Sequence, residues 1–460
     1  MERVLPKTLD YTDVLPLAVE SRSRRRTFFP INGQTFNSDG ANIIRIDLSA
    51  DALLDTQHSY LRFTFTAQAQ SCGIDYAGGH SFVRRLRVEQ SGTVLEDINS
   101  YNRLMGAVVL PCQSTDNHHK ERTITEGVRG LSQTSAAMAN TDLAMTANAQ
   151  GGLQGSQITN NADDQIAATD SYEFCIPLTS GILNNDKLIP LMLMSAPLTI
   201  EIELASSVQA VCWNTGAGNY DISNVRYIAN LIEVGGDVAQ QLRMVQEMSG
   251  GVLTLAGQTY RHFTGQVGTG QTGDAVINVP ARVKSMKSLF FVNQGDGADA
   301  YGTYDVSTGT NNRLNEFQLK IGSVVYPPTP IRATFGNGAA ATIANVRAES
   351  FMELAKAWGN VGSNKGLGQL NWRNWNVVNN TRPTASAAGT AMVFAPMGID
   401  LEAFQRVAIE SGVNTADRSL PISLVLNFST ATSSAQNYDV YVLADALFYI
   451  NADGSMSVSV

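Results

Sequence analysis

Residue types that could perform metal or acid–base chemistry are few and scattered in this chain. Five histidines occur, and the closest grouping of metal-ligand types is His118-His119, shortly after Cys112. Histidine and cysteine are common zinc ligands, but adjacent residues on a strand or loop point in different directions, so this spacing does not fit a metal site. The sequence therefore predicts no metal ligand and no cofactor.

Two patterns that could serve phosphate binding or nucleophilic catalysis are incomplete. The glycines of Gly265 to Gly273 have the spacing G-x-x-G-x-G-x-x-G. They lack the Lys-Ser/Thr ending of a phosphate-binding loop and do not lead into a helix, so a hairpin loop explains them better. No serine stands in a G-x-S-x-G nucleophile elbow. We expect no catalytic residue and a protein that is not an enzyme.

One cationic cluster contrasts with an acidic chain. The formal net charge is -9 and the isoelectric point is about 5.1, which argues against a body that wraps nucleic acid through its general surface. Arg22, Arg24, Arg25 and Arg26 nevertheless cluster just before the first strand signal. We predict that they lie on an N-terminal arm that reaches phosphates or anionic lipid head groups. A solvated arm, or an arm that donates salt bridges to another subunit, is the alternative.

The elements that must position these residues occur twice. Leu86 to Gln90 reads as a strand that turns at Ser-Gly and returns, and Phe317 to Ile321 does the same at Gly-Ser. Each half also closes with an apolar run followed by Asn-Tyr-Asp, at Tyr220 in the first half and Tyr438 in the second. Internal repetition of this kind indicates two copies of one β-rich module.

Strand patterns dominate both halves. Tyr60 to Thr66 alternates apolar and polar residues as a half-buried strand requires, whereas helical patterns occupy too little sequence for an α/β fold. The helical patch Tyr101 to Val109 is expected to close one end of the first barrel. We predict an all-β chain of two tandem eight-stranded antiparallel jelly rolls with short helices and long inter-strand loops. The expected parts are an arm over 1–27, a first jelly roll over 28–235 with a long loop at 113–170, a linker helix over 236–250, and a second jelly roll over 251–460 with a loop at 359–389.

Composition supports two modules with unusual surfaces. Of the 460 residues 43% are hydrophobic, enough for large cores, but only 16% are charged. Such a low charge favours an outer face covered by neighbours or by uncharged loops. The four cysteines are far apart and predict free thiols in a reducing compartment. Neither a signal-peptide core nor an apolar run long enough to span a membrane is found, so we expect a soluble protein made in the cytosol.

Several segments, taken in order, resemble double jelly-roll major capsid proteins of the adenovirus and tailless-phage lineage, most of all those of polinton-like viruses and virophages. The resemblance is spread over nearly the whole chain and depends on order and spacing. The segments are Phe36 to Leu48, Leu54 to Phe65, Phe174 to Leu183, Phe317 to Pro327, Glu410 to Asn414 and Phe448 to Gly454.

The resemblance implies a structural protein of the virion. Three chains would form a homotrimeric capsomer with a pseudo-hexameric outline, and capsomers would tile an icosahedral shell together with penton and minor capsid proteins. The loops at 113–170 and 359–389 would become towers or intersubunit loops, and the arginine arm would face the genome or an inner membrane. Synthesis in the host cytoplasm is implied, with nuclear assembly allowed, and no small-molecule substrate is expected.

Four loop aromatics are candidates for intersubunit contacts under this interpretation: Trp372, Trp375, Tyr301 and Tyr304. Tryptophan and tyrosine are enriched at the energetic centres of protein interfaces. The alternative is that each of them packs beneath its own loop.

Two other classes of protein share duplicated jelly rolls. A carbohydrate-binding or surface-adhesive β-sandwich protein would bind glycans as a monomer. A cupin-type enzyme would need histidines clustered on barrel strands, which five scattered histidines do not provide.

Overall fold

The structure is a computed structural model of the chain, and it describes the sheets, the helices and part of the loops. Within this described part, no helix is both long enough and apolar enough to cross a bilayer. The described residues are 21–68, 72–126, 166, 168–213, 218–295, 306–307, 309, 313–333, 348–359, 361, 367–368, 370, 375, 394–404, 410–432 and 434–460.

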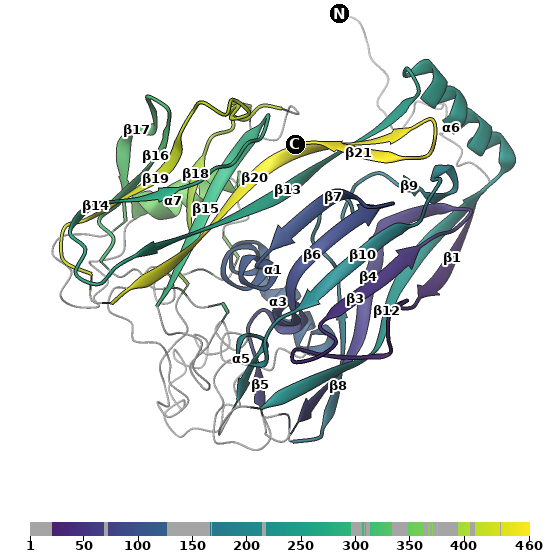
Figure 1. Cartoon of the computed structure of the whole chain (residues 1–460), viewed down its shortest axis with the longest axis horizontal. Coiled ribbons are helices and arrows are strands. Elements are labelled where there is room, and N and C mark those ends of the chain that lie inside the picture. The colour runs from purple at the N-terminus through teal and green to yellow at the C-terminus, as the bar shows by residue number, and fades with distance from the viewer. Residues whose placement is uncertain are drawn as a thin grey trace, which may run out of the picture.

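Two antiparallel sheets form the first half of the chain (Figure 1). The main path of one sheet is β1 (Ser21–Phe28), β12 (Asn219–Val234), β4 (Leu53–Gln68) and β8 (Ser171–Ile176), with β2 (Thr35–Asn37) paired to β12 and β9 (Ile189–Pro190) paired to β4. The other sheet is β3 (Ile43–Leu48), β10 (Leu198–Leu204), β6 (Val83–Gln90) and β7 (Thr93–Asn99). A short ribbon pairs β5 (Cys72–Ile74) with β11 (Val211–Trp213).

The second half repeats the order of the eight strands on the two main paths. Its first sheet is β13 (Val252–Val267), β20 (Gln436–Asn451), β15 (Met286–Gly295) and β18 (Met397–Asp400), with β21 (Met456–Ser459) paired to β20. Its second sheet is β14 (Gly273–Asn278), β19 (Ile422–Phe428), β16 (Glu316–Ile321) and β17 (Val324–Arg332). Each of the eight strands on these two paths therefore has a counterpart in the same place in the other half, and the prediction of two tandem antiparallel jelly rolls is confirmed.

The repeated tyrosines occupy equivalent core positions. Tyr220 on β12 lies 6.0 Å from Phe65 on β4, measured between ring centroids, and Tyr438 on β20 lies 6.3 Å from Phe291 on β15. All four side chains are buried. From Leu61 onward β4 alternates buried and half-buried residues, as expected of a strand with one face on the core. The sequence repeat therefore arises because the two rolls have equivalent aromatic packing in their cores.

Short helices connect the strands. Those of the first half are η2 (Gly78–Phe82), α1 (Tyr101–Arg103), the π-helical η3 (Leu104–Val109), α2 (Leu110–Gln113), α3 (Asp116–Thr125), η7 (Leu191–Leu193) and α5 (Ser207–Ala210). The linker helix is α6 (Gly236–Met248), and the second half contains α7 (Ala348–Ala357).

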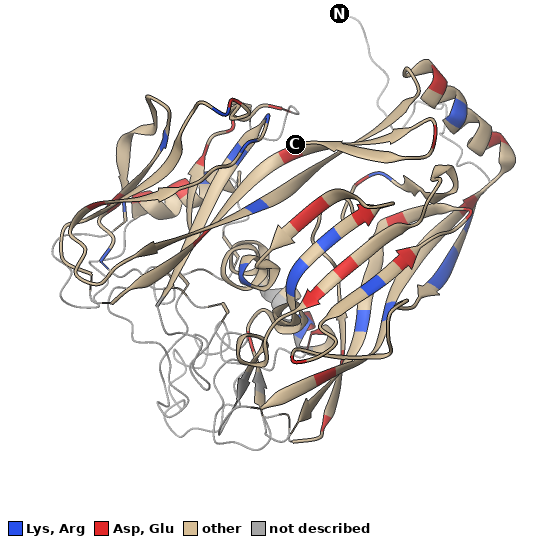
Figure 2. Cartoon of the chain, viewed as in Figure 1, with Lys and Arg blue, Asp and Glu red and all other residues tan. Residues whose placement is uncertain are grey.

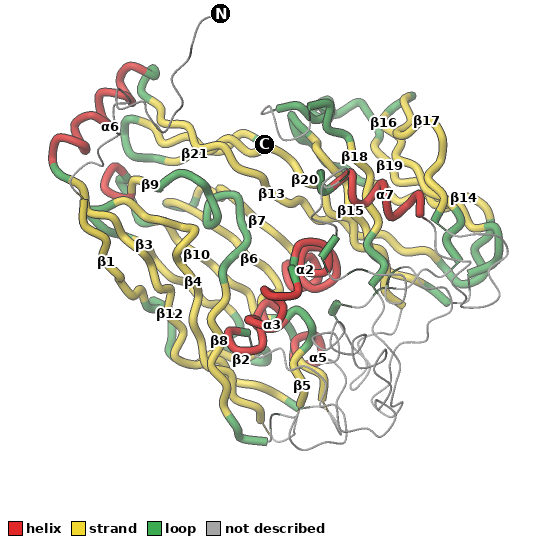
Figure 3. Tube along the Cα trace, turned by 180° about the vertical axis from the view of Figure 1, so that it is seen from behind, coloured by secondary structure: helices red, strands yellow, loops and turns green. Residues whose placement is uncertain are grey.

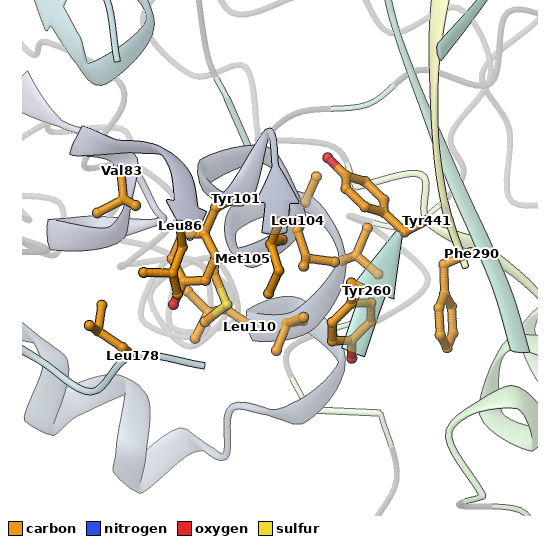
Figure 4. Close-up of a cluster of buried hydrophobic side chains, with 14 of the residues drawn as sticks. Val83, Leu86, Tyr101, Leu104, Met105, Leu110, Leu178, Tyr260, Phe290 and Tyr441 are labelled. Atoms are coloured by element: carbon orange, nitrogen blue, oxygen red, sulfur yellow. The ribbon is translucent and has the colours of Figure 1, made fainter. Parts of the chain in front are cut away.

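The helical patch at 101–109 lies between the two rolls instead of closing one end of the first barrel (Figures 1 and 3). Figure 4 shows Leu104 and Leu110 facing Tyr441 and Tyr260 of the second roll. Every residue of η3 is buried, because both sides of the helix meet apolar surface. The expected position was wrong because one-sided periodicity cannot show that a second roll covers the other side.

The N-terminal boundary also differs from the expected arm over 1–27. Ser21–Phe28 is strand β1, paired in register with Val234 to Tyr227 on β12. The strand has no apolar alternation, because it is an edge strand whose first six residues are exposed. Charged side chains are common on such edges, where they discourage pairing with other chains. The four arginines therefore belong to the first roll.

Candidate assembly surfaces

A buried polar seam centred on Arg103 joins the two rolls. Arg103 is 3% exposed. Its guanidinium donates to the carbonyl oxygens of Val306 at 2.6 Å and Asn293 at 2.9 Å, and its Nε lies 3.4 Å from Asp439 Oδ2. On the other side of this carboxylate, His262 Nε2 lies 2.8 Å from Oδ1. Because a buried charge is costly unless it is paired, the first-roll arginine depends on second-roll partners.

Further hydrogen bonds cross between the rolls. Gln90 at the end of β6 donates to the carbonyl of Gly454 at 3.1 Å and accepts from the Met456 amide at 2.6 Å. The Tyr441 hydroxyl donates to the carbonyl of Ser100 at 3.0 Å. One hydrophobic cluster contains buried residues of both rolls. The two rolls thus form a single packed unit that holds its outer surfaces in fixed relative positions.

A groove of about 560 Å³ also lies between the rolls, and its lining is largely polar. Lys287, a 5% exposed cation in its wall, has Nζ 2.9 Å from Glu402 Oε1 and 3.3 Å from Asp445 Oδ1. Protein carboxylates therefore already balance this charge. Like Arg103 in the seam, Lys287 is paired within the protein, so the groove offers no unpaired cation here for a bound anion.

The β1 arginines form a cationic sheet edge (Figure 2). All four are exposed. Arg24 lies 3.1 Å from Glu233 on β12, Arg25 donates to the Tyr60 hydroxyl at 3.4 Å, and the Arg26 guanidinium stacks 4.9 Å from the Phe28 ring. The arginines are therefore only partly paired within the chain. They present several positive charges along one strand, and such a surface is suitable for phosphates or for acidic groups of another chain.

The outward face of the β3–β10–β6–β7 sheet carries a lattice of ion pairs. Glu201 at its centre lies 2.7 Å from Arg45 on β3 and 3.8 Å from Arg87 on β6. Arg85 forms two hydrogen bonds to the carboxylate of Asp97 on β7. Figure 2 shows these strands with alternating red and blue bands. Such a satisfied charged face is suited to water, since burying it would require desolvating every pair.

The equivalent face of the second roll is different. The row Arg45–Glu201–Arg87 of the first roll corresponds by register to Val276–Val425–Gln318 of the second. Val276 is 61% exposed and Val425 is half-buried. The same position in the duplicated fold is therefore charged in one roll and uncharged, with an exposed valine, in the other.

Of the four aromatic residues predicted to make intersubunit contacts, the structure describes Trp375. Trp375 is 1% exposed, donates from Nε1 to the carbonyl of Pro396 at 3.0 Å, and packs edge-on against Phe351 at 5.1 Å. It is a core residue of its own chain, which is the alternative interpretation given above. Trp372, Tyr301 and Tyr304 lie outside the described residues.

The first long loop begins with a helix that a buried ion cluster holds in place. Arg122 on α3 donates from Nε to Glu126 Oε2 at 2.8 Å, and His80 Nε2 lies 3.7 Å from Glu126 Oε1. Arg122 also donates to the carbonyl of Tyr76 at 2.6 Å. Burial opposes ionisation of Glu126, but the positive charges of Arg122 and His80 dominate and lower its pKa to about 2. Most of the expected tower at 113–170 lies outside the described residues.

The remaining chemistry-bearing residues are dispersed. Among the described residues, no three His, Cys, Asp or Glu side chains gather closely enough to hold a metal ion. His118 lies on α3, its Nδ1 3.1 Å from the Ser114 hydroxyl. Cys72 is a buried free thiol whose pKa burial raises to about 12, Cys112 is also free and buried, and Cys175 is half-buried. The side chain of Cys212 is not described.

No family model matches the sequence, and no curated protein matches it significantly. Solved structures do share its fold. The Faustovirus major capsid protein aligns with a TM-score of 0.60 at 8% identity, over 95% of this chain and 92% of that chain. A chain from the structure of the Sputnik virophage aligns with a TM-score of 0.57 at 12% identity, over 100% of this chain and 93% of that one. The mavirus major capsid protein aligns with a TM-score of 0.51 at 11% identity, over 100% and 96%.

These alignments include both rolls and the linker between them, because they cover almost the full length of each chain. The neighbours from Faustovirus and mavirus are major capsid proteins by name. They confirm the fold that the sequence resemblance implied. The chain has the double jelly-roll fold of viral major capsid proteins, as found in Faustovirus and in the virophages Sputnik and mavirus.

Proposed function

We propose that the protein is a major capsid protein whose homotrimers form pseudo-hexameric capsomers that tile an icosahedral shell. One observation carries this proposal: two rolls of identical strand order are fused into one packed unit. Three such chains around a threefold axis present six similar rolls, so a hexagonal outline follows from three identical subunits. Six near-equivalent sides allow such a unit to pack edge to edge in a shell.

The β1 arginines supply the contact with the particle contents in this proposal. Arg22, Arg24, Arg25 and Arg26 are exposed on a single edge strand, and phosphates of a genome or of an inner membrane are suitable partners. The protein is then located in the virion, after synthesis in the host cytoplasm and assembly there or in the nucleus. Penton and minor capsid proteins complete the shell.

A second copy of the chain is the proposed partner of the second-roll row at Val276. The internal comparison supports this assignment, because the matching row of the first roll carries ion pairs suited to water. Covering an exposed valine on the outward face of a sheet stabilises the complex, by about 25 cal/mol per Å² of apolar surface. Trp372, Tyr301 and Tyr304 remain candidates for the same role, whereas Trp375 serves its own core.

Mass measurement by light scattering during size exclusion, followed by electron microscopy, tests the proposal. We expect a trimeric mass and, under assembly conditions, closed shells or flat arrays of hexagonal units. A protein that remains monomeric at all concentrations and forms no particles would contradict it. Saturable glycan binding by that monomer would favour the adhesive alternative.

A further inference from the structure

The linker helix α6 has two faces of different character. Gln246 is 7% exposed and donates to the carbonyl of Ile450 at 3.1 Å, which fixes the face that packs on β20. Met244 and Met248 each lie two residues away from Gln246, so they project about 160° from it around the helix axis. They therefore point away from the rolls, at the edge of the molecule where α6 lies (Figure 1).

The outward face is unusually apolar for a solvated helix. Met248 is 88% exposed, Met244 58% and Val245 49%. Met248 is one turn from Met244 and three residues from Val245, so the three side chains form a continuous stripe. Solvent-facing helix positions normally carry charged or polar residues. This stripe, Met244, Val245 and Met248, is therefore an exposed apolar surface on which another segment can dock.

The chain itself brings a suitable segment to the helix. Ser21, the first residue of β1, pairs with Val234, and α6 begins at Gly236. The residues just before β1 include the apolar run Val14 to Val19, Val-Leu-Pro-Leu-Ala-Val. Such a run, if extended, spans about 20 Å, and a helix of 13 residues is also about 20 Å long. Chain connectivity through Ser21 therefore keeps the last residue of the run within reach of the start of α6, and the length of the run matches that of the helix.

Charge also favours this segment as the cover. Residues 1–20 contain four acidic residues, Glu2, Asp10, Asp13 and Glu20, against two basic ones, Arg3 and Lys7. The neighbouring strand β1 presents its four exposed arginines. An acidic and apolar segment is thus complementary both to the arginine edge and to the methionine stripe.

We propose that Val14 to Val19 of each chain docks along the outward face of its own α6 and covers the stripe. The contact is independent of the proposed capsid role, because it requires only the N-terminal segment and the linker helix of one chain. It assigns the segment a defined binding surface next to the arginine strand.

Methionine oxidation in the full-length protein tests the docking. Hydrogen peroxide is added, and peptide mapping by mass spectrometry follows Met244, Met248 and, as an internal reference, the half-exposed Met352 on α7. Replacing Leu15 and Leu17 by Asp should speed oxidation of Met244 and Met248 about tenfold, the change expected when a segment docked ~90% of the time is released. Oxidation of Met352 should not change. Thr8→Asp adds the same type of charge outside the apolar run and should have no effect.

A disulfide test identifies which chain supplies the segment. In a Leu17→Cys, Val245→Cys protein, oxidised glutathione should link positions 17 and 245 within one chain, and is itself reduced. The denatured protein then keeps the mass of a monomer, and peptide mapping without reductant finds the two positions in one disulfide-linked peptide pair. Links between chains would overturn the proposal and identify a second copy as the partner. Equal oxidation rates of Met244 and Met248 in the wild type and the Leu15→Asp, Leu17→Asp variant would also overturn it, leaving the stripe to a lipid surface or another protein.

Discussion

At the scale of single residues, Trp375 shows why an aromatic in a loop is an ambiguous predictor of an interface. Its ring is buried against Phe351 and its indole nitrogen is satisfied by Pro396. Trp375→Ala should lower the free energy of unfolding by about 3 to 5 kcal/mol, because it leaves a large cavity. Trp375→Phe, which loses the hydrogen bond but keeps most of the packing, should cost less. Urea unfolding of both variants measures this. A Trp375→Ala protein of native stability that no longer self-associates would instead make it an interface residue.

The Glu126 carboxylate should make the free energy of unfolding depend on pH. Its folded pKa of about 2 lies below the value of an unfolded Glu, so the carboxylate stabilises the fold above about pH 4.5 and this stabilisation fades as the pH falls toward 2. The loss between about pH 6 and pH 3 should be roughly 2 kcal/mol. The stability advantage of the wild type over Glu126→Gln should shrink by that amount in urea unfolding at the two pH values. Glu121→Gln, at an exposed position on α3, is the control. A constant difference would show that Arg122 and His80 do not hold this carboxylate charged.

At the scale of elements, β1 combines structural and binding roles that substitution can separate. Deleting residues 1–26 would remove most of an edge strand from β12, so a loss of assembly after deletion would be ambiguous. Replacing Arg22, Arg24, Arg25 and Arg26 by Gln keeps the backbone ladder and removes only the charge. The variant should fold and form trimers, but its binding to DNA or to anionic vesicles should fall at least about tenfold at low salt. Co-sedimentation measures it. Unchanged binding would exclude the strand as the contact with the particle contents.

The outward faces of the two equivalent sheets make a matched pair of test sites. Val276→Glu should weaken trimer formation, because it places a charge within the proposed contact, where it would be desolvated. Ile43→Glu, on β3 and 38% exposed, makes the same type of change beside the ion-pair lattice and should leave the mass unchanged. Light scattering across a dilution series distinguishes the two. If both variants assemble like the wild type, the row at Val276 is not an intersubunit face.

The sequence predicted elements whose buried face gives a periodic side-chain pattern, and it missed features that depend on backbone pairing or on contacts with the other roll. Tyr220 and Tyr438, and the two hairpins at 86 and 317, were predictable because equivalent cores select equivalent residues. Strand β1 was missed because its stability comes from backbone pairing with β12, which leaves no side-chain period. The row at Val276 becomes visible only when the two halves are aligned strand by strand. Arg103 gave no signal at all, because its partners come from the other roll.

At the scale of the whole molecule, duplication creates an internal joint that a single roll does not need. The joint could have been purely apolar, but this chain places Arg103, Asp439 and His262 within it. In such a polar joint, the buried groups can all form their hydrogen bonds and ion pairs in only one relative position of the two rolls. That requirement selects a unique arrangement, which the proposed capsomer needs if three chains are to form the same hexagonal outline at every place in a shell.

The joint should therefore determine whether the two rolls unfold together. Arg103→Ala leaves the Asp439 carboxylate and two carbonyl groups without their cation, and loss of one partner of a buried pair typically costs about 3 to 5 kcal/mol. Because the seam links the rolls, calorimetry should show one transition for the wild type and two for Arg103→Ala. Arg84→Ala removes an exposed arginine paired with Glu203 at 3.4 Å and should preserve the single transition. If Arg103→Ala lowers the melting temperature while unfolding stays all-or-none, the hydrophobic cluster shared by the rolls, and not the polar seam, couples them.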